Sequence, residues 1–254
     1  MTFRRAILRG SAAALLVSFA FAAPSRAAPT LVAVAANFTE AANEIAAAFT
    51  AATGHTVTYS FGPTGQLYTQ ITQNAPFEVF LAADQARPEK AEAEGLAVPG
   101  SRFTYAVGQL VLWSADAELI DGSEAALKTG GFTHVAIATP ETAPYGAAAV
   151  EVMRALGIHE ALASKIVQGK SISQTHQFVA TGNAELGFVA LSQVVADDAG
   201  SRWMIPQDLY TPIRQDAVLL KTGAENEAAT AYVDFLKGPE ARAIIEKYGY
   251  APGE

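Results

Sequence analysis

Short apolar segments alternate with helix-start signals along this chain, and this alternation constrains the fold more than any other feature. Leu31–Ala35, Val57–Phe61 and Phe77–Ala82 are short apolar runs, each followed closely by a polar residue that can begin a helix. The intervening segments show the i, i+4 spacing of a buried helix face, as at Ile45 and Phe49. This β-α-β-α-β order with short loops predicts parallel strands joined by right-handed crossovers.

Local signals mark where these helices begin and end. Asn37 stands where an N-cap is expected, and Glu40 follows three residues later, as a capping box requires. Gly54 occupies the usual position just past a helix end. Thr64 opens the next helix, and Asp84 is expected to cap the one after that.

The pattern then restarts, which predicts a second unit of the same kind. Further strands are expected at Leu110–Trp113, His134–Ile137, Leu186–Ala190 and Ala217–Leu220, and further helices at Tyr145–Leu156, Ala228–Leu236 and Pro239–Tyr248. We therefore expect two α/β lobes with a ligand cleft between them. The chain should cross to lobe 2 (108–212) and return, so that lobe 1 combines 28–107 with 213–254.

Residues 1–27 have the organisation of a signal peptide. Arg4, Arg5 and Arg9 precede an apolar run over 11–23, and Ser25-Arg26-Ala27 resembles a cleavage site. The run is shorter than the ~20 residues that a membrane-spanning helix needs. The chain has no cysteine, which rules out disulfides and a lipid anchor on that residue. We expect export to the periplasm.

The charge balance is acidic. The formal net charge is −8, and the chain after residue 27 is near −12, because residues 1–27 hold four arginines and no acid. Such a surface argues against nucleic acid and against insertion into anionic membranes. If the ligand is an anion, local hydrogen-bond donors must hold it.

Four predicted helix starts carry such donors. Asn37, Thr64 and Tyr145 each follow a strand and open a helix, and 171–173 precedes another. Helix N-termini offer unpaired N–H groups and a positive dipole end, so their convergence would hold a small anion without Lys or Arg. A site made only of donors suits molybdate, tungstate or sulfate. It disfavours hydrogen phosphate, whose O–H needs an acceptor.

The helix-start residues and several short motifs of this chain have other interpretations. Taken singly, Ser, Thr and Asn at helix starts are more often ordinary caps than ligands. Gly169-Lys170-Ser171 fails as a phosphate loop because position 164 is serine. The histidines lack metal-binding spacing, no G-x-S-x-G nucleophile motif occurs, and Tyr248 and Tyr250 are expected to pack. An enzyme is therefore not expected.

Several segments together resemble one known family. They are Ala33–Phe38, Ser60–Gly65, Ala75–Gln85, Ala138–Pro140, Pro144–Gly146, Glu185–Val189 and Phe235–Ala241. Over nearly the whole chain after residue 27, the sequence resembles the periplasmic molybdate-binding proteins. That resemblance implies a two-lobed type II periplasmic binding fold, each lobe a mainly parallel sheet flanked by helices.

The resemblance also implies a set of ligand-binding residues: Ala36, Asn37, Thr64, Tyr145 and Ile172. The side chain and N–H of Asn37, the N–H of Ala36, the hydroxyl of Thr64, and backbone donors at Tyr145 and Ile172 would contact the oxyanion. The metal would be held only through its oxygens, with no direct metal coordination and no cofactor. Some members add a tyrosine hydroxyl where this chain has Ala190.

The function implied is capture of molybdate, and possible capture of tungstate, in the periplasm. The partner would be an inner-membrane ABC permease, and the protein would act as a monomer. Molybdate and tungstate cannot be separated from sequence. The alternatives are a binding protein for another oxyanion such as sulfate or for a small organic anion, and an enzyme on the same scaffold.

Overall fold

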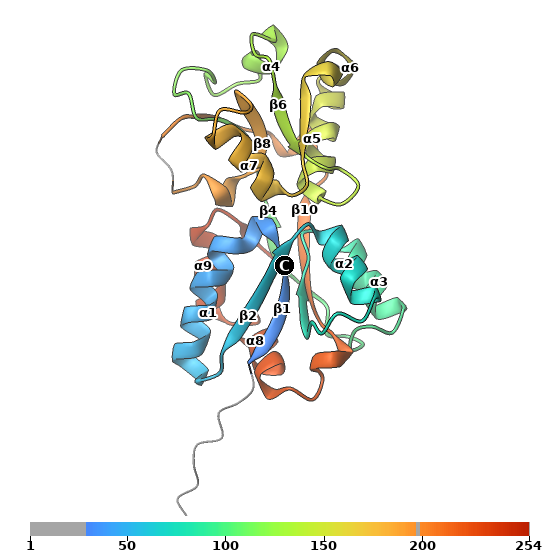
Figure 1. Cartoon of the computed structure of the whole chain (residues 1–254). Coiled ribbons are helices and arrows are strands. Elements are labelled where there is room, and N and C mark those ends of the chain that lie inside the picture. Colours follow the sequence, from blue (N-terminus) through green and yellow to red (C-terminus); the bar gives the residue numbers. More distant parts are fainter. Residues whose placement is uncertain (1–28, 197–198, 254) are drawn as a thin grey trace, which may run out of the picture.

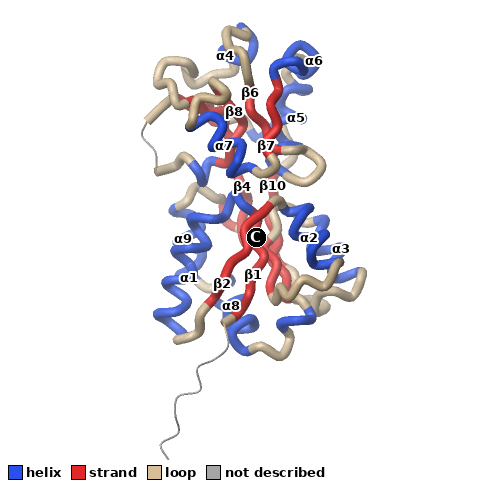
Figure 2. The backbone as a smooth tube through the Cα atoms, viewed as in Figure 1, coloured by secondary structure: helices blue, strands red, loops and turns tan. Residues whose placement is uncertain are grey.

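Two sheets flanked by helices form the part of the chain that the computed structural model describes, residues 29–196 and 199–253 (Figure 1, Figure 2). We call the part built on the first sheet lobe 1 and the part built on the second sheet lobe 2. This confirms the predicted two-lobed α/β architecture. The predicted signal peptide, residues 1–27, lies outside the described residues, within which no helix is long and apolar enough to cross a membrane.

The sheet of lobe 1 has the spatial order β11-β4-β10-β3-β1-β2. Strand β1 pairs in parallel with β2 and β3, as the predicted crossovers require, and β10 runs antiparallel to β3 and β4. The strand bounds are β1 (Thr30–Ala35), β2 (Val57–Gly62), β3 (Val79–Leu81), β4 (Phe103–Gly108), β10 (Ile213–Leu219) and β11 (Ala251–Pro252).

Helices cover both faces of this sheet. Val32 and Val34 of β1 face one apolar cluster, while Ala33 faces the other, because side chains alternate along a strand. The helices of the first face are α1 (Thr39–Thr53), α8 (Glu227–Lys237) and α9 (Pro239–Lys247), and those of the second are α2 (Thr64–Thr72) and α3 (Ala86–Ala93). The strand ends at the lobe junction are therefore held by packing on two sides.

The sheet of lobe 2 has the order β7-β6-β8-β5-β9 and is also covered on two faces. Its strands are β5 (Leu110–Ser114), β6 (Val135–Ala138), β7 (Ile166–Gly169), β8 (Leu186–Ala190) and β9 (Ser201–Met204). Its helices are α4 (Ala125–Thr129), α5 (Pro144–Ala155), α6 (His159–Leu162) and α7 (Ile172–Ala180). Helix α5 packs in one core cluster and α7 in the other.

Strands β4 and β10 link the lobes. Gln109 alone separates β4 from β5, and β10 returns the chain to lobe 1 (Figure 1). Both sheets are mixed, because β10 runs antiparallel to β3 and β4 in lobe 1, and β5 runs antiparallel to β8 and β9 in lobe 2. Sequence patterns missed β4, β7, β9 and β11. Their segments, such as Ser201-Arg202-Trp203-Met204, mix polar with apolar residues and are too short for a clear alternation.

The start of the first helix differs from its prediction. A 3-10 turn over Ala36–Phe38 follows β1, and α1 begins only at Thr39 without a side-chain cap. Asn37 is therefore not an N-cap, and the capping box with Glu40 is wrong. The side-chain amide of Asn37 instead lies within hydrogen-bond distance of buried residues that are distant in sequence. Gly54, with a φ of 76°, ends α1 as predicted.

Phe49→Ala is expected to lower the free energy of unfolding by about 3–5 kcal/mol. Phe49 is fully buried on α1 and meets the rings of Tyr232 and Phe235 edge-on. Urea unfolding monitored by circular dichroism measures the change. Thr50→Ala, on the exposed side of the same helix, is the control and should stay within about 0.5 kcal/mol of the parent protein. Equal losses in both variants would contradict this account of the core.

Candidate binding site

A small cavity lies at the lobe junction, where helix starts of both lobes meet. The cavity is small, with a volume of about 10 Å³. Its lining comes from the ends of β1, β2 and β3 and from the starts of α2, α5 and α7: Ala35, Ala36, Asn37, Gly62, Pro63, Thr64, Ala83, Ala143, Pro144, Tyr145 and Ile172. All five residues that the resemblance implied are thus brought together. Whether they bind an oxyanion stays a prediction.

Backbone donors converge on this cavity. Thr64, Tyr145 and Ile172 stand in the first turn of α2, α5 and α7, where N–H groups have no partner within the helix. Among the described residues, no loop or side-chain hydrogen bond uses these N–H groups. Each helix also places its positive dipole end there. The local field therefore favours a negative ion.

The hydroxyl of Thr64 is held in place by the neighbouring strand end. Its Oγ1 accepts a hydrogen bond from the N–H of Ala83 at 3.0 Å, and the residue is 1% exposed. The hydroxyl hydrogen itself is left for another acceptor. In this cavity, that acceptor can be an oxygen of a bound anion.

Asn37 belongs to a buried polar cluster behind the cavity. Its Nδ2 donates to Oε1 of Gln215 at 2.9 Å and to the hydroxyl of Tyr250 at 3.0 Å. Tyr250 donates to the carbonyl oxygen of Asn37 at 2.7 Å, and Ser192 of lobe 2 donates to the same oxygen at 2.9 Å. Nε2 of Gln215 donates to the hydroxyl of Tyr145 at 3.0 Å.

Hydrogen bonds across the junction hold the lobes closed. The N–H of Gly65 donates to the carbonyl oxygen of Thr142 at 2.9 Å, next to the cavity. Arg87 of lobe 1 donates to the carbonyl oxygen of Glu141 at 2.9 Å, and Ser173 donates back to Ala36 at 3.2 Å. A Cβ at Gly65 would stand 3.0 Å from the Cα of Thr142, so this close approach favours glycine.

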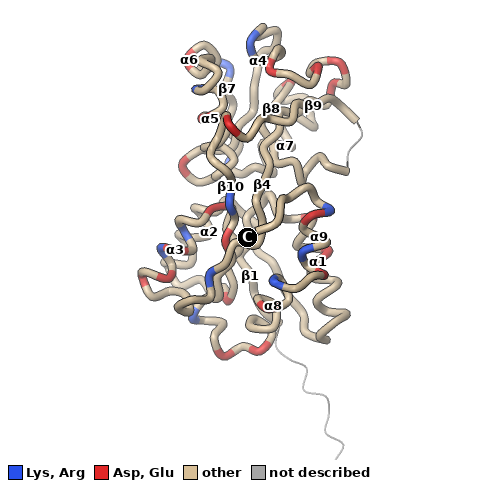
Figure 3. Tube along the Cα trace, turned by 180° about the vertical axis from the view of Figure 1, so that it is seen from behind, with Lys and Arg blue, Asp and Glu red and all other residues tan. Residues whose placement is uncertain are grey.

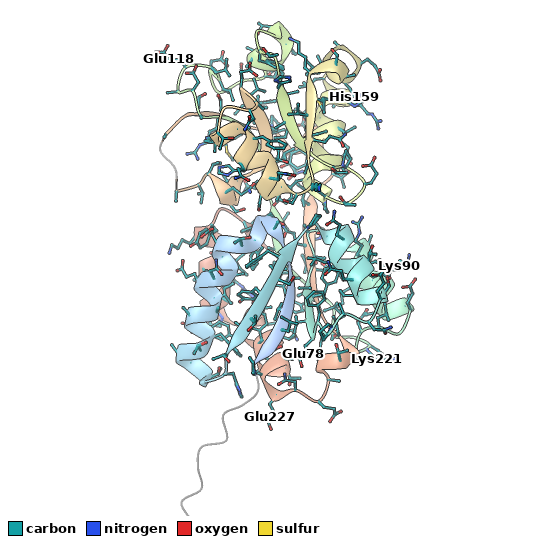
Figure 4. All side chains as sticks on the ribbon, viewed as in Figure 1. Glu78, Lys90, Glu118, His159, Lys221 and Glu227 are labelled. Atoms are coloured by element: carbon teal, nitrogen blue, oxygen red, sulfur yellow. The ribbon has the colours of Figure 1, made fainter. Side chains whose placement is uncertain are left out.

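No charged side chain lines the small cavity. Lysine, arginine and acidic residues lie mostly on outer helices and loops, among them α3 and α9 (Figure 3). The labelled Lys90, Glu118, His159 and Glu227 lie far from the lobe junction (Figure 4). Within the described residues, no group of three or more His, Cys, Asp or Glu side chains is placed to hold a metal ion. All side chains of the lining are uncharged.

A larger cavity of about 340 Å³ lies beside the small one and shares Ala83 and Pro144 with it. Charges of both signs line it, including Asp84 and Arg87. The guanidinium of Arg87 forms an ion pair with Asp84, which also accepts the N–H of Arg87 at 3.0 Å. The predicted cap position is wrong, because Gln85 is the N-cap of α3, but Asp84 still bonds the first turn of the helix through Arg87. Arg214 and Glu151 add one further charge of each sign to the lining of the larger cavity.

Burial keeps the tyrosine hydroxyls of the cluster neutral. Desolvation raises the pKa of Tyr105, Tyr145 and Tyr250 above the ordinary value. These hydroxyls therefore remain donors throughout the neutral range. No positive charge arises from them at any pH.

Sequence reasoning missed Gln215, Tyr105 and Ser192, and it assigned Tyr250 only a packing role. Tyr250 does pack edge-on against Phe38, but its hydroxyl also bonds Asn37. Gln215 lies in β10, and the sequence predicted a strand only for the apolar segment Ala217–Leu220. No local signal marks these residues, since their partners lie far away in sequence.

Comparison with known proteins places the chain in a family. The model of the family described as bacterial extracellular solute-binding protein matches residues 30–251. The chain belongs to that family. Among members named molybdate-binding protein ModA, that of Rhodobacter capsulatus is 65% identical over 243 residues, which cover 96% of each chain. That of Azotobacter vinelandii is 60% identical over 232 residues, covering 90% of this chain and 92% of the relative.

Two solved structures show the same architecture. The periplasmic molybdate-binding protein of Azotobacter vinelandii superposes with a TM-score of 0.86 at 43% identity, covering 89% of this chain and all of the other. The sulfate-binding protein SubI of Mycobacterium tuberculosis reaches 0.72 at 15% identity, covering 89% of this chain and 87% of that one. The second likeness concerns the fold alone.

The stability of this solute-binding protein is expected to fall above about pH 10, where exposed tyrosines ionise. The buried tyrosines have a raised pKa in the folded state, so the unfolded chain loses their protons first. The stability is therefore fully present below the unfolded pKa and is lost as the pH rises through the folded one. Urea unfolding between pH 8 and 11 measures it. A free energy that stays constant to pH 11 would contradict the burial of these hydroxyls.

Proposed function

We propose that this protein captures molybdate in the periplasm and delivers it to an ABC importer of the inner membrane. The observation that carries the proposal is the small cavity where uncharged donors of both lobes converge. The relatives at 60–65% identity, which are named molybdate-binding proteins, support the same ligand. A role without catalysis fits this site, since its lining holds no titratable pair that could act as acid and base.

The donors fit a small tetrahedral dianion. In lobe 1, the N–H groups of Ala36 and Asn37, the amide of Asn37 and the hydroxyl of Thr64 surround one side of the anion. In lobe 2, the N–H groups of Tyr145 and Ile172 complete the shell. Charge-assisted bonds from neutral donors are roughly twice as strong as neutral pairs, and the surrounding protein excludes water from them. The metal contacts the protein only through its oxygens.

Closure follows from the division of the donors between lobes. An open form offers the anion only part of the shell, whereas the closed form offers all of it. The anion therefore shifts the population toward the closed form. The contacts of Gly65 with Thr142 and of Arg87 with Glu141 then add to the closed state.

Discrimination among anions rests on protons and on size. Hydrogen phosphate would bring an O–H into a shell of donors and leave it without an acceptor, which costs about 1–3 kcal/mol. Molybdate and tungstate bring no proton near neutral pH. Sulfate also brings none, so only its smaller radius separates it from them. Tungstate should bind beside molybdate, because the donors meet the same oxygens.

Molybdate at about 1,000 times its dissociation constant is expected to stabilise the native protein by ~4 kcal/mol and to raise its midpoint by roughly 8–16 °C. Thermal unfolding is compared with molybdate, tungstate, sulfate, phosphate and no addition. Tungstate should match molybdate, while phosphate should shift the midpoint little. No shift with either metal oxyanion would refute the proposed function. A larger shift with sulfate than with molybdate would reassign the ligand.

Thr64→Ala is expected to weaken molybdate binding by about 10- to 150-fold, the factor for losing a hydrogen bond to a charged group. Isothermal titration calorimetry measures the dissociation constant. Thr69→Ala, on the exposed side of the same helix, is the matched control and should bind as the parent does. Thermal unfolding without ligand separates lost binding from lost folding, because the N–H of Ala83 also loses its partner. Unchanged affinity in Thr64→Ala would remove this residue from the site.

A further inference from the structure

A fully buried glutamine stands at the centre of the polar cluster behind the cavity. Gln215 is 0% exposed and lies on β10, at a register irregularity of its pairing with β4. Its Oε1 is 2.9 Å from Nδ2 of Asn37 and 3.0 Å from the hydroxyl of Tyr105, and its Nε2 is 3.0 Å from the hydroxyl of Tyr145. Gln215 thus contacts a cavity residue of each lobe.

The hydrogens of this arrangement do not all find acceptors. Tyr105 has one hydroxyl hydrogen and two acceptors within reach, the carbonyl oxygen of Ala82 at 3.1 Å and Oε1 of Gln215. Tyr145 only accepts, so its own hydrogen has no acceptor among the described residues. Both amide hydrogens of Asn37 are used inside the cluster. Its Oδ1 is then the atom left to face an anion, which would repel it.

Turning both amides by 180° removes the conflicts at Tyr105 and Tyr145 without moving a heavy-atom position, because amide oxygen and nitrogen are nearly equal in shape. Oδ1 of Asn37 then lies 3.0 Å from the hydroxyl of Tyr250, which shares its single hydrogen between that oxygen and the carbonyl oxygen of Asn37 at 2.7 Å. Tyr105 then donates to Ala82 and accepts from Nε2 of Gln215. Tyr145 donates to Oε1 of Gln215, which gives its hydrogen a partner. The second hydrogen of Gln215 Nε2 goes to Oδ1 of Asn37. Nδ2 of Asn37 is released from the cluster.

We propose that Gln215 is a positioning residue for the bound oxyanion: held by Tyr105 and Tyr145, it turns the amide nitrogen of Asn37, not the oxygen, toward the cavity. The inference rests on the proposed function and deepens it. The orientation of these side chains is set by a backbone carbonyl oxygen. In the turned arrangement, the carbonyl of Ala82 takes the hydrogen of Tyr105, so Tyr105 accepts from Gln215. Gln215 must then present Nε2 to that side and to Asn37.

The consequence is selectivity against protonated anions. With Nδ2 toward the cavity, Asn37 adds a donor to a shell that already consists of donors. With Oδ1 toward the cavity, the same residue would accept the O–H of hydrogen phosphate and oppose molybdate. Gln215 therefore controls which class of oxyanion the site accepts, although it does not itself line the cavity.

The close packing around Gln215 supports a fixed orientation. A Cβ at Gly108, the last residue of β4, would collide with the hydroxyl of Tyr145 and with Nε2 of Gln215. The absence of a side chain at 108 is what lets these two groups meet. Gln215 is 0% exposed, so water does not satisfy its amide in either orientation.

The test is Gln215→Met, which keeps the length of the side chain and removes its hydrogen bonds. Calorimetric titrations with molybdate and with phosphate at the same pH give two dissociation constants. We expect molybdate binding to weaken by about 10-fold, because Asn37 loses its preorganised orientation. Phosphate binding should weaken less, so the ratio of the two constants should fall severalfold. A residue with only a structural role would weaken both anions equally and leave the ratio unchanged.

Two further variants test whether Gln215 acts on molybdate binding through Asn37. Gln85→Met is the matched control, because Gln85 bonds Thr104 and Asp216 in the same region and does not contact Asn37. It should keep both dissociation constants. In an Asn37→Ala background, Gln215→Met should change the molybdate constant less than twofold, since the group that it positions is gone. A full 10-fold effect in that background would overturn the inference.

Tyr105→Phe covers the case in which Gln215→Met does not fold, as judged by thermal unfolding without ligand. It removes the group that sets the orientation of Gln215, so the ratio should move in the same direction. An unchanged ratio in this variant, or in Gln215→Met, overturns the inference. These outcomes are separable from failure of the proposed function. If the parent protein binds no molybdate, the function is wrong; if the parent binds and the ratio never moves, only the role of Gln215 is wrong.

Discussion

An ion-sized cavity without a charged lining depends on one constraint: backbone N–H groups from separate helix starts must meet within a few ångströms. A peptide N–H is fixed to its helix and cannot reach out as a lysine can. Each donor must therefore be placed by the fold. The starts of α2, α5 and α7 and the turn after β1 all end at the lobe junction, because each follows a strand whose carboxyl end lies there.

The same constraint explains the small residues around the cavity. Alanines at 35, 36, 83 and 143 and glycines at 62 and 65 allow the two lobes to approach until their backbones form hydrogen bonds directly. Strands β4 and β10 fix the direction of that approach. A single residue separates β4 from β5, so the link between the lobes is short.

An uncharged cavity that takes an anion is compatible with the negative net charge of this protein. The net charge of −8 would repel an anion at long range, but the ionic atmosphere screens that repulsion beyond about 10 Å in salt. At short range, the helix ends and hydroxyl groups dominate. The buried tyrosines with raised pKa values keep the polar cluster uncharged, so the donor set does not change with pH near neutrality. In the function and the inference that we propose, selectivity depends on which atoms point inward, and the cluster behind Asn37 sets this.

The sequence by itself determined the lobes' strand and helix alternation, the glycine that ends α1 and the helix starts that supply donors. Those features depend on local periodicity and on capping chemistry, which neighbouring residues specify. It even placed Thr64 and Tyr145 at their helix starts. Strands of mixed polarity such as β4 and β9 were not predicted, because pairing with neighbouring strands, rather than their own sequence pattern, makes them strands.

Only the tertiary structure decided what surrounds Asn37. The local pattern predicted an N-cap, but β1 runs into a 3-10 turn and the amide lies within hydrogen-bond distance of Gln215 and Tyr250, which are 178 and 213 residues away in sequence. A buried amide needs hydrogen-bond partners, and here they come from β10 and from the end of the chain. Local sequence states which residues can donate; the fold alone determines where each donor points.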